Sequence, residues 1–415
     1  MTRVDELQKK YPNLAREIIV KWDVLRHGIK DSEVLDKVAI WDRAGSFQSR
    51  DLHGVTLQSM EEKRPGTFSK PGFVVRPDPF FMENGLGVRF PRALDSPYEI
   101  WEVGEDKFAL LEGDEKVTDI YFPSPKPRNE EAVTSRGTPV SSLVSGIGHC
   151  FRIDPVRFCE YFSHGEQCKF CNYNSTYKDA GNVGIERAVA LNLADTVEAF
   201  KIVGANTRLV EGRFQMGGFN SSEQEMKVYF DFVEQIASGT SYRTNIQIST
   251  QPMSKQHMQR LKDAGLTCVS FNLEVWDPEI FAEVCPGKAK HRGRERYLEA
   301  YQEAVEIFGW GSVGCDFVAG VSLMPDNGHK TWQDARDSHI EGNRWLIQHG
   351  VMPVFIALRL GVGSIYGDDP ANREKLPPTE YLLEVAMAHH AAMLEYGLYD
   401  RLNRLLYCPM DCLSP

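Results

Sequence analysis

Three closely spaced cysteines are the residues best suited to chemistry in this chain. Cys159, Cys168 and Cys171 lie in the segment FCEYFSHGEQCKFCN, with eight residues between the first two and two between the last two. Three thiolates can hold three irons of a [4Fe–4S] cluster and leave the fourth iron open to a chelating small molecule. The same cysteines together with Cys150 could instead bind one structural zinc ion, and their spacing leaves both readings open.

Composition narrows the context of these cysteines. The chain has 415 residues, of which 42% are apolar and 25% charged, as in an ordinary globular protein. The nine cysteines are an odd number, and the amino-terminal segment lacks the apolar core of a signal peptide, so disulfides explain them poorly. The net charge of −11 argues against a nucleic-acid partner. With no long apolar run, we expect a cytoplasmic protein without a membrane segment.

Apolar runs alternate with amphipathic, helix-length segments through residues 139–370. The runs cover residues 140–148, 209–217, 245–250, 268–276, 314–323 and 352–361. Helix signals between them include Asn192, a capping box of Ser222 and Glu225, and Ser254 before a helix that stops at Gly265. This alternation predicts six β/α units with a parallel sheet, either doubly wound or closed into a partial barrel.

The two flanking regions differ from this central domain. Residues 1–138 combine helical patterns over 4–26 and 31–44 with short strand-like pieces, which predicts an α+β accessory domain. The proline-bearing stretch 123–139 marks its boundary. Residues 371–415 are expected to form a helix and a cysteine-bearing cap. There, Cys408 and Cys412 are candidates for an auxiliary cluster with Cys285 or Cys150, or are ordinary core thiols.

The pair Cys168-Lys-Phe-Cys171 resembles the cluster motif of the radical S-adenosylmethionine superfamily, and the likeness extends over residues 140–370. The family's common motif has three residues between its first two cysteines, whereas this chain has eight. Cys159 is the preferred first ligand because Cys150 falls closer to the strand. The resemblance implies an α/β fold, a partial (β/α)6 barrel. The segment NLEVWD is closest to biotin-synthase-like branches that act on small molecules.

By the same resemblance, residues at the strand ends would hold the cosubstrate S-adenosylmethionine. Gly217 and Gly218 would receive its amino group through backbone carbonyls, with Phe219 standing where Glu is common. Asn272 and Glu274 share one face of the fourth strand, although an internal salt bridge would also explain Glu274. Further predicted contacts are Arg294 for the methionyl carboxylate, Gly320 and Phe170 near the adenine, and Ser249 and Arg359 at pocket positions.

The resemblance also implies a reaction. An external electron donor such as flavodoxin or ferredoxin would reduce the cluster, which would cleave S-adenosylmethionine and yield a 5′-deoxyadenosyl radical. That radical would abstract hydrogen from a small-molecule substrate. Two alternatives stay open: radical modification of a peptide or RNA partner, and a zinc-stabilised β/α protein without radical chemistry.

Overall fold

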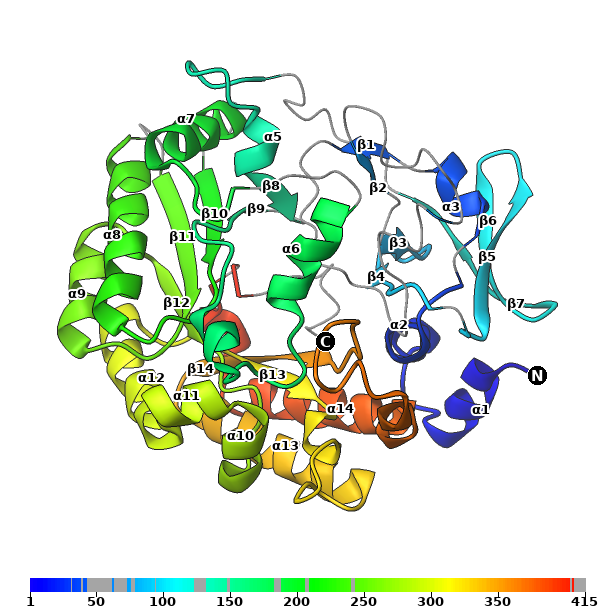
Figure 1. The fold of residues 1–415 in the computed structure, drawn as a ribbon. Helices are drawn as coiled ribbons and strands as arrows, with labels where there is room; N and C mark the ends of the chain where they lie inside the picture. Colours follow the sequence, from blue (N-terminus) through cyan, green and yellow to red (C-terminus); the bar gives the residue numbers. More distant parts are fainter. Residues whose placement is uncertain are drawn as a thin grey trace.

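The structure is a computed structural model that describes residues 1–30, 32–38, 40–42, 62, 73–75, 79–93, 95–122, 132–147, 150–182, 188–205, 209–239, 243–403 and 405–406. A seven-stranded sheet forms its centre, in the order β14-β13-β12-β11-β10-β9-β8 (Figure 1). The strands are β8 (Ser145–Ile147), β9 (Cys150–Ile153), β10 (Leu209–Gln215), β11 (Arg243–Thr250), β12 (Cys268–Phe271), β13 (Val313–Ala319) and β14 (Val351–Ala357).

The strands from β9 to β14 are all parallel and follow one another in sequence, whereas β8 pairs antiparallel at the edge. Among the described residues, the two edge strands β14 and β8 do not pair with each other, so the sheet is open. The predicted partial (β/α)6 barrel is therefore confirmed.

Helices follow the parallel strands and cover the outer face of the sheet (Figure 1). They are α7 (Leu193–Gly204), α8 (Ser222–Gly239), α9 (Lys255–Asp263), α12 (Arg294–Phe308), α13 (Trp332–Gln348) and α14 (Thr379–Glu395). Asn192, Ser254 and Thr331 each cap a helix through a side-chain oxygen, which satisfies amides that the first turn leaves unpaired. As predicted, α9 begins after Ser254 and ends before Gly265, whose φ is +113°.

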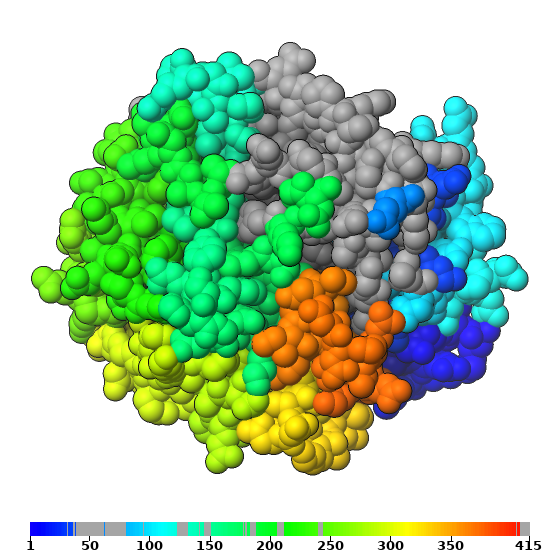
Figure 2. Space-filling model, in the orientation of Figure 1, coloured from blue at the N-terminus to red at the C-terminus, as the bar shows by residue number. Residues whose placement is uncertain are grey.

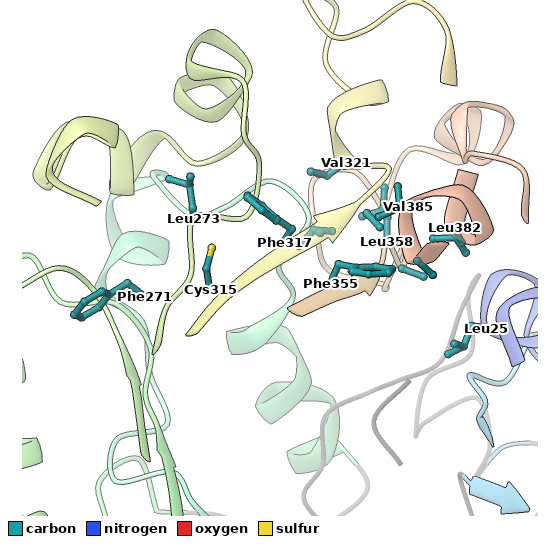
Figure 3. Packing of buried hydrophobic residues seen from close by; sticks show 14 of the residues in the cluster. Leu25, Phe271, Leu273, Cys315, Phe317, Val321, Phe355, Leu358, Leu382 and Val385 are labelled. Atoms are coloured by element: carbon teal, nitrogen blue, oxygen red, sulfur yellow. The ribbon is translucent and has the colours of Figure 1, made fainter. Parts of the chain in front are cut away.

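Alternate residues of each strand point outward to these helices or inward to the barrel. Phe214 of β10 packs outward against Phe200 of α7 and Phe232 of α8. Figure 3 shows the same arrangement further along the sheet, where Phe355 of β14 faces Leu382 and Val385 of α14. Side chains next to these outward residues therefore face the barrel interior.

The amino-terminal region packs against the barrel and shares its core. Its helices are α1 (Arg3–Lys10), α2 (Arg16–His27) and α3 (Val34–Lys37); they lie beside small antiparallel sheets on one side of the molecule (Figures 1 and 2). Trp22 of α2 stacks on Phe355 at 5.1 Å between ring centroids. The strands of this region are β1 (Ile40–Asp42), β2 (Phe73–Val75), β3 (Pro79–Phe81), β4 (Gly87–Arg89), β5 (Tyr98–Gly104), β6 (Lys107–Glu112) and β7 (Glu115–Ile120).

Two predicted elements are wrong. The helix expected over 31–44 is only the short α3, because Ile40 and Trp41 instead pair with Val75 and Val74 in β1 and β2. The strand expected over 140–148 begins as a helical turn, α5 (Val140–Leu143), which the hydroxyl of Ser142 stabilises by donating to the Pro139 carbonyl at 2.7 Å. The first parallel strand is therefore β9, and Cys150 opens it.

The last described residues fill the amino-terminal end of the barrel. Leu405 and Leu406 are buried in an apolar cluster with Cys268, Met352 and Val354. Cys408 and Cys412 lie outside the described residues, as does the segment 123–131 within the predicted boundary. In the described part of the chain, no helix has the length and apolar character needed to cross a bilayer.

Candidate iron–sulfur and cosubstrate site

The three predicted cysteines lie in the loop between β9 and α6 (Tyr173–Asn182), and backbone hydrogen bonds fix this loop. Cys159 precedes a 3-10 turn, η1 (Glu160–His164), whose first amide donates to the Gly218 carbonyl at 3.0 Å. The Cys171 amide donates to the Cys168 carbonyl at 2.9 Å, and the Lys169 amide to the Val284 carbonyl at 2.9 Å. The loop is thereby attached to the end of β10 and to α10 (Pro278–Val284).

The three sulfur atoms lie close enough to influence one another's ionisation. Burial raises the pKa of Cys159, and the neighbouring Cys168 raises it further. Burial raises the pKa of Cys171 too, together with the charges of Cys168 and Cys159. A hydrogen bond from the buried Cys285 thiol lowers the pKa of Cys168 against the effect of burial. Three thiols in one largely buried place match the donor set of a cluster.

A mononuclear metal site would need a tighter arrangement of donors. Over the ranges that the structure describes, no three His, Cys, Asp or Glu side chains converge on one point that could hold a single ion. A [4Fe–4S] cluster does not require its cysteines to converge on one point, because each cysteine binds its own iron. The side chain of Cys150, the fourth ligand in the zinc alternative, lies outside the described part.

The Gly217–Gly218 turn packs directly on the cysteine loop. A Cβ added to Gly217 would lie 2.2 Å from the Phe158 carbonyl oxygen and 2.5 Å from Cys159 Cα. A Cβ on Gly218 would meet the ring of Tyr161 at 2.7 Å. Only glycine permits this approach, so the pair brings a bare backbone edge against the first cysteine.

An ion pair between Glu274 and Lys288 lies beside the cysteines. Lys288, in α11 (Pro286–His291), places its Nζ 2.6 Å from Glu274 Oε1 and 2.7 Å from the Asn272 carbonyl oxygen. Burial opposes its charge, but Glu274, Tyr297 and Cys168 raise the pKa of Lys288 well above its usual value. The internal salt bridge considered for Glu274 is therefore present.

Glu274 also has an unusual backbone. Its φ is +71°, a left-handed conformation that a residue other than glycine keeps only where its surroundings impose it. Here the Glu274 amide donates to the Asp316 carbonyl at 2.9 Å and its carbonyl accepts from the Val318 amide at 2.8 Å. Strained residues of this kind cluster at functional sites, and this one holds its carboxylate against Lys288.

Asn272 continues the polar side of β12 toward β13. Its amide nitrogen donates to Asp316 Oδ2 at 3.0 Å, and its oxygen accepts from Ser270 Oγ at 3.0 Å. Burial and the nearby Glu274 carboxylate raise the pKa of Asp316 to about 6. Asn272 and Glu274 both follow the end of β12, and they join one polar group with Asp316 and Lys288.

A second buried network supports the turn from behind. The carboxylate of Glu225 accepts from Thr250 Oγ1 at 2.5 Å and from Gln251 Nε2 at 3.0 Å, and burial raises its pKa. Gln251 in turn accepts from the Tyr161 hydroxyl at 2.6 Å. Arg292 donates to the Phe219 carbonyl at 3.0 Å. Glu225, expected in a capping box, instead ties the cysteine loop to the ends of β10 and β11.

The other predicted residues occupy different surroundings. Ser249 lies at the end of β11, and its carbonyl accepts from the Tyr229 hydroxyl at 2.5 Å. Arg294 donates to the Trp276 carbonyl at 3.0 Å and lies over its ring at 4.5 Å. Gly320, with φ +92°, lies against Pro377. Phe170 packs on the hydrophobic core.

The sequence did not single out Lys288 or Asp316, and it suggested other roles for Glu225, in a helix cap, and for Cys285, as a possible ligand of an auxiliary cluster. Lys288 stands in the segment CPGK, three residues after Cys285. Its place after the Asn272–Glu274 strand end was a usable signal, since a carboxylate expected inside a barrel needs a nearby cation.

Comparisons with known proteins are limited in identity and extent. No protein-family model matches the chain. The bacteriochlorophyllide c C-7(1)-hydroxylase of Chlorobaculum limnaeum is 27% identical over 214 residues, covering 46% of this chain and 51% of that protein. The chain thus matches about half the length of this curated relative.

Solved structures give similar partial coverage. Methylornithine synthase is 16% identical with a TM-score of 0.42, over 59% of this chain and 62% of that one. A radical SAM methyltransferase from Sphaerobacter thermophilus is 12% identical with a TM-score of 0.39, over 73% of this chain and 76% of that one. The three gathered cysteines, the glycine turn and the incomplete parallel barrel fit the resemblance to radical S-adenosylmethionine enzymes that the sequence indicates.

Proposed function

We propose that this protein binds one [4Fe–4S] cluster through Cys159, Cys168 and Cys171 and uses it to cleave S-adenosylmethionine reductively. The observation that carries the proposal is the common location of the three thiols, the glycine turn and the Lys288–Glu274 pair. The donor chemistry fits the cluster, because three thiolates leave one iron for a chelating ligand.

The residues around the cysteines fit the cosubstrate as well. Of the two carbonyls predicted to receive its amino group, that of Gly217 is the one we propose, because the Gly218 carbonyl already accepts from the Glu160 amide at 3.0 Å. We assign the methionyl carboxylate to Lys288 rather than Arg294, because the charge of Lys288, which also pairs with Glu274, acts on Cys168. Asn272 and Glu274 provide hydrogen-bonding groups for ribose hydroxyls and the amino group. Ser249, Phe170 and Gly320 stay as proposed contacts.

Held by Cys159, Cys168 and Cys171, a [4Fe–4S] cluster would supply one-electron reduction of the sulfonium with an electron from an external donor, giving methionine and a 5′-deoxyadenosyl radical. The protein's part is to position the groups and to exclude water. Buried Glu225, Tyr161 and Gln251 hold the cysteine loop rigid, and the Glu274 backbone fixes its carboxylate. That radical would take a hydrogen atom from a small-molecule substrate and become 5′-deoxyadenosine.

Partners and location follow from the same chemistry. A flavodoxin or ferredoxin would supply the electron, and free thiols suit the reducing cytoplasm. The curated relative is named as a hydroxylase of bacteriochlorophyllide c, and the similarity covers only about half of each protein. We take the substrate to be a small molecule; a peptide or RNA is the alternative. No auxiliary cluster is proposed from Cys408 and Cys412.

The test is anaerobic reconstitution followed by addition of dithionite and S-adenosylmethionine. We expect about four irons per chain and formation of 5′-deoxyadenosine. Cys168→Ala and Cys171→Ala should each lose both. The matched control is Cys268→Ala, which removes a buried thiol at the opposite end of β12 and should keep the cluster.

Two results would overturn the proposal. One is a protein that binds one zinc and no iron, as the zinc-stabilised alternative requires. The other is a protein with four irons that forms no 5′-deoxyadenosine under reduction, because its cluster would then serve only electron transfer.

A further inference from the structure

One arginine inside the barrel carries a positive charge without a matching carboxylate. Arg213 is on the interior side of β10, since its neighbour Phe214 packs outward on α7 and α8. Its side chain makes one hydrogen bond, from Nε to Gln247 Oε1 at 2.7 Å. Over the described ranges, no Asp or Glu oxygen lies at ion-pair distance from its guanidinium.

Unlike Arg213, two other cations in the barrel interior each have a carboxylate partner. Arg152 on β9, adjacent to Arg213 in register, places Nε 2.9 Å from Asp154 Oδ1. Lys288 has Glu274. A charge held away from bulk water is costly unless it is paired. Packing alone therefore does not explain why Arg213 lacks a carboxylate partner among the described residues.

The surroundings of Arg213 are polar and keep some accessible surface. Across the barrel, Asp316 and Asn272 form their hydrogen bond on the same interior side, and the charge of Arg213 acts on Asp316 without contact. Arg213, Asn272 and Asp316 are all partly exposed although their strands are buried on the outer face. Gln247 accepts from the Nε of Arg213, and over the described ranges no hydrogen bond engages the two terminal nitrogens of the guanidinium.

We propose that Arg213 is the anion-binding residue of the substrate site, and that the substrate is a small polar molecule whose carboxylate or phosphate group takes the place of the missing carboxylate. A guanidinium oriented by Gln247 offers two parallel donors, the geometry that planar anions accept. Asp316, on the facing strand, then receives a donor group of the same molecule, an ammonium or a hydroxyl. This inference rests on the proposed function and specifies its substrate class.

The assignment distinguishes substrate classes. A large apolar ring system would leave the Arg213 charge desolvated and unpaired, whereas a small anion neutralises it. The site lies on β10, β11 and β13 (Arg213, Gln247 and Asp316), and Asn272 links its Asp316 to the Lys288–Glu274 pair, to which we assign the cosubstrate carboxylate.

The test is calorimetric titration of the reconstituted protein, with and without S-adenosylmethionine, using succinate, inorganic phosphate and 4-aminobutyrate as probes. Butane-1,4-diol is the uncharged control. Arg213→Gln should weaken binding of the preferred anion by about tenfold or more, and Arg213→Lys should retain part of it. Arg260→Gln, on exposed α9, is the matched control. Asp316→Asn should weaken 4-aminobutyrate more than succinate.

The outcomes separate this inference from the proposed function. Equal anion binding by the natural chain and Arg213→Gln, equal binding of the diol, or no binding of any anion would each overturn the assignment. A preference for phosphate over succinate, or the reverse, identifies which anion the site takes. Iron content and cosubstrate binding, measured on the same preparations, report on the proposed function independently, so anion binding in a protein without a cluster would refute that function alone.

Discussion

Replacing Lys288 with Met isolates the structural and functional parts of its ion pair with Glu274. The side chains of Lys288 and Glu274 are only 12% and 11% exposed, so the pair is largely removed from water. Losing one member leaves the other as an uncompensated charge, which costs about 3–5 kcal/mol in the free energy of unfolding. We expect Lys288→Met to lose that amount in anaerobic urea unfolding of the cluster-free protein.

The second variant in this experiment restores the charge balance. Lys288→Met with Glu274→Gln removes both charges and leaves the Asn272 carbonyl without its lysine donor, a loss of about 1 kcal/mol. The double variant should therefore unfold within about 1–2 kcal/mol of the natural chain. Both variants should nonetheless fail to bind S-adenosylmethionine in equilibrium dialysis. A single variant as stable as the natural chain would refute the burial argument, and a double variant that binds the cosubstrate normally would refute the role of Lys288.

Two further predictions concern the cysteine loop and the helical layer. Gly217→Ala should lower iron incorporation at least several-fold, because its Cβ would overlap the Phe158 carbonyl and Cys159. The control Gly181→Ala, whose Cβ would have no atom within 4 Å, should bind iron like the natural chain. Equal iron content in the two variants would contradict this prediction. Burial lowers the pKa of His389 to about 3, so the unfolded chain binds its proton first and stability is lost as pH falls from about 6.5 toward 3. At pH 5, His389 therefore lowers the free energy of unfolding by about 2 kcal/mol relative to its value at pH 7.5. His389→Phe should remove this difference when urea unfolding is compared at the two pH values. If the variant keeps the same difference, His389 is not its cause.

The architecture was predictable because the signals for it are local. Each apolar run with its helix start and stop, such as Ser254 and Gly265, can be read without knowledge of the rest of the chain. The failures occur where distant partners decide. Ile40 and Trp41 form a strand through pairing with Val74 and Val75, more than thirty positions away, and no local pattern indicates such pairing.

The candidate site shows the same division. The spacing of Cys159, Cys168 and Cys171 and the Gly217–Gly218 pair are short motifs, and the fold brings both to one place. The roles of Lys288 and Arg213 can be inferred only from their neighbours in three dimensions. Lys288 pairs with a buried carboxylate fourteen positions before it, whereas Arg213 has no ion-pair partner among the described residues. A charged residue in a sequence does not reveal whether its charge is satisfied.

The two ends of the barrel have opposite chemical character, and this difference directs the reaction to one of them. At the amino-terminal end, Leu406 packs so closely on β13 that a Cβ on Gly314 would lie 2.7 Å from its methyl group, which leaves no room for a ligand. Toward the carboxyl ends of the strands the interior is polar, with Arg213, Asn272 and Asp316 still partly exposed. The apolar packing of Leu405 and Leu406 at the amino-terminal end would shield the proposed radical chemistry at the cysteine end from water on that side. The same geometry explains why the cysteine loop, the strained Glu274 and the unpaired Arg213 all belong to that one half of the barrel.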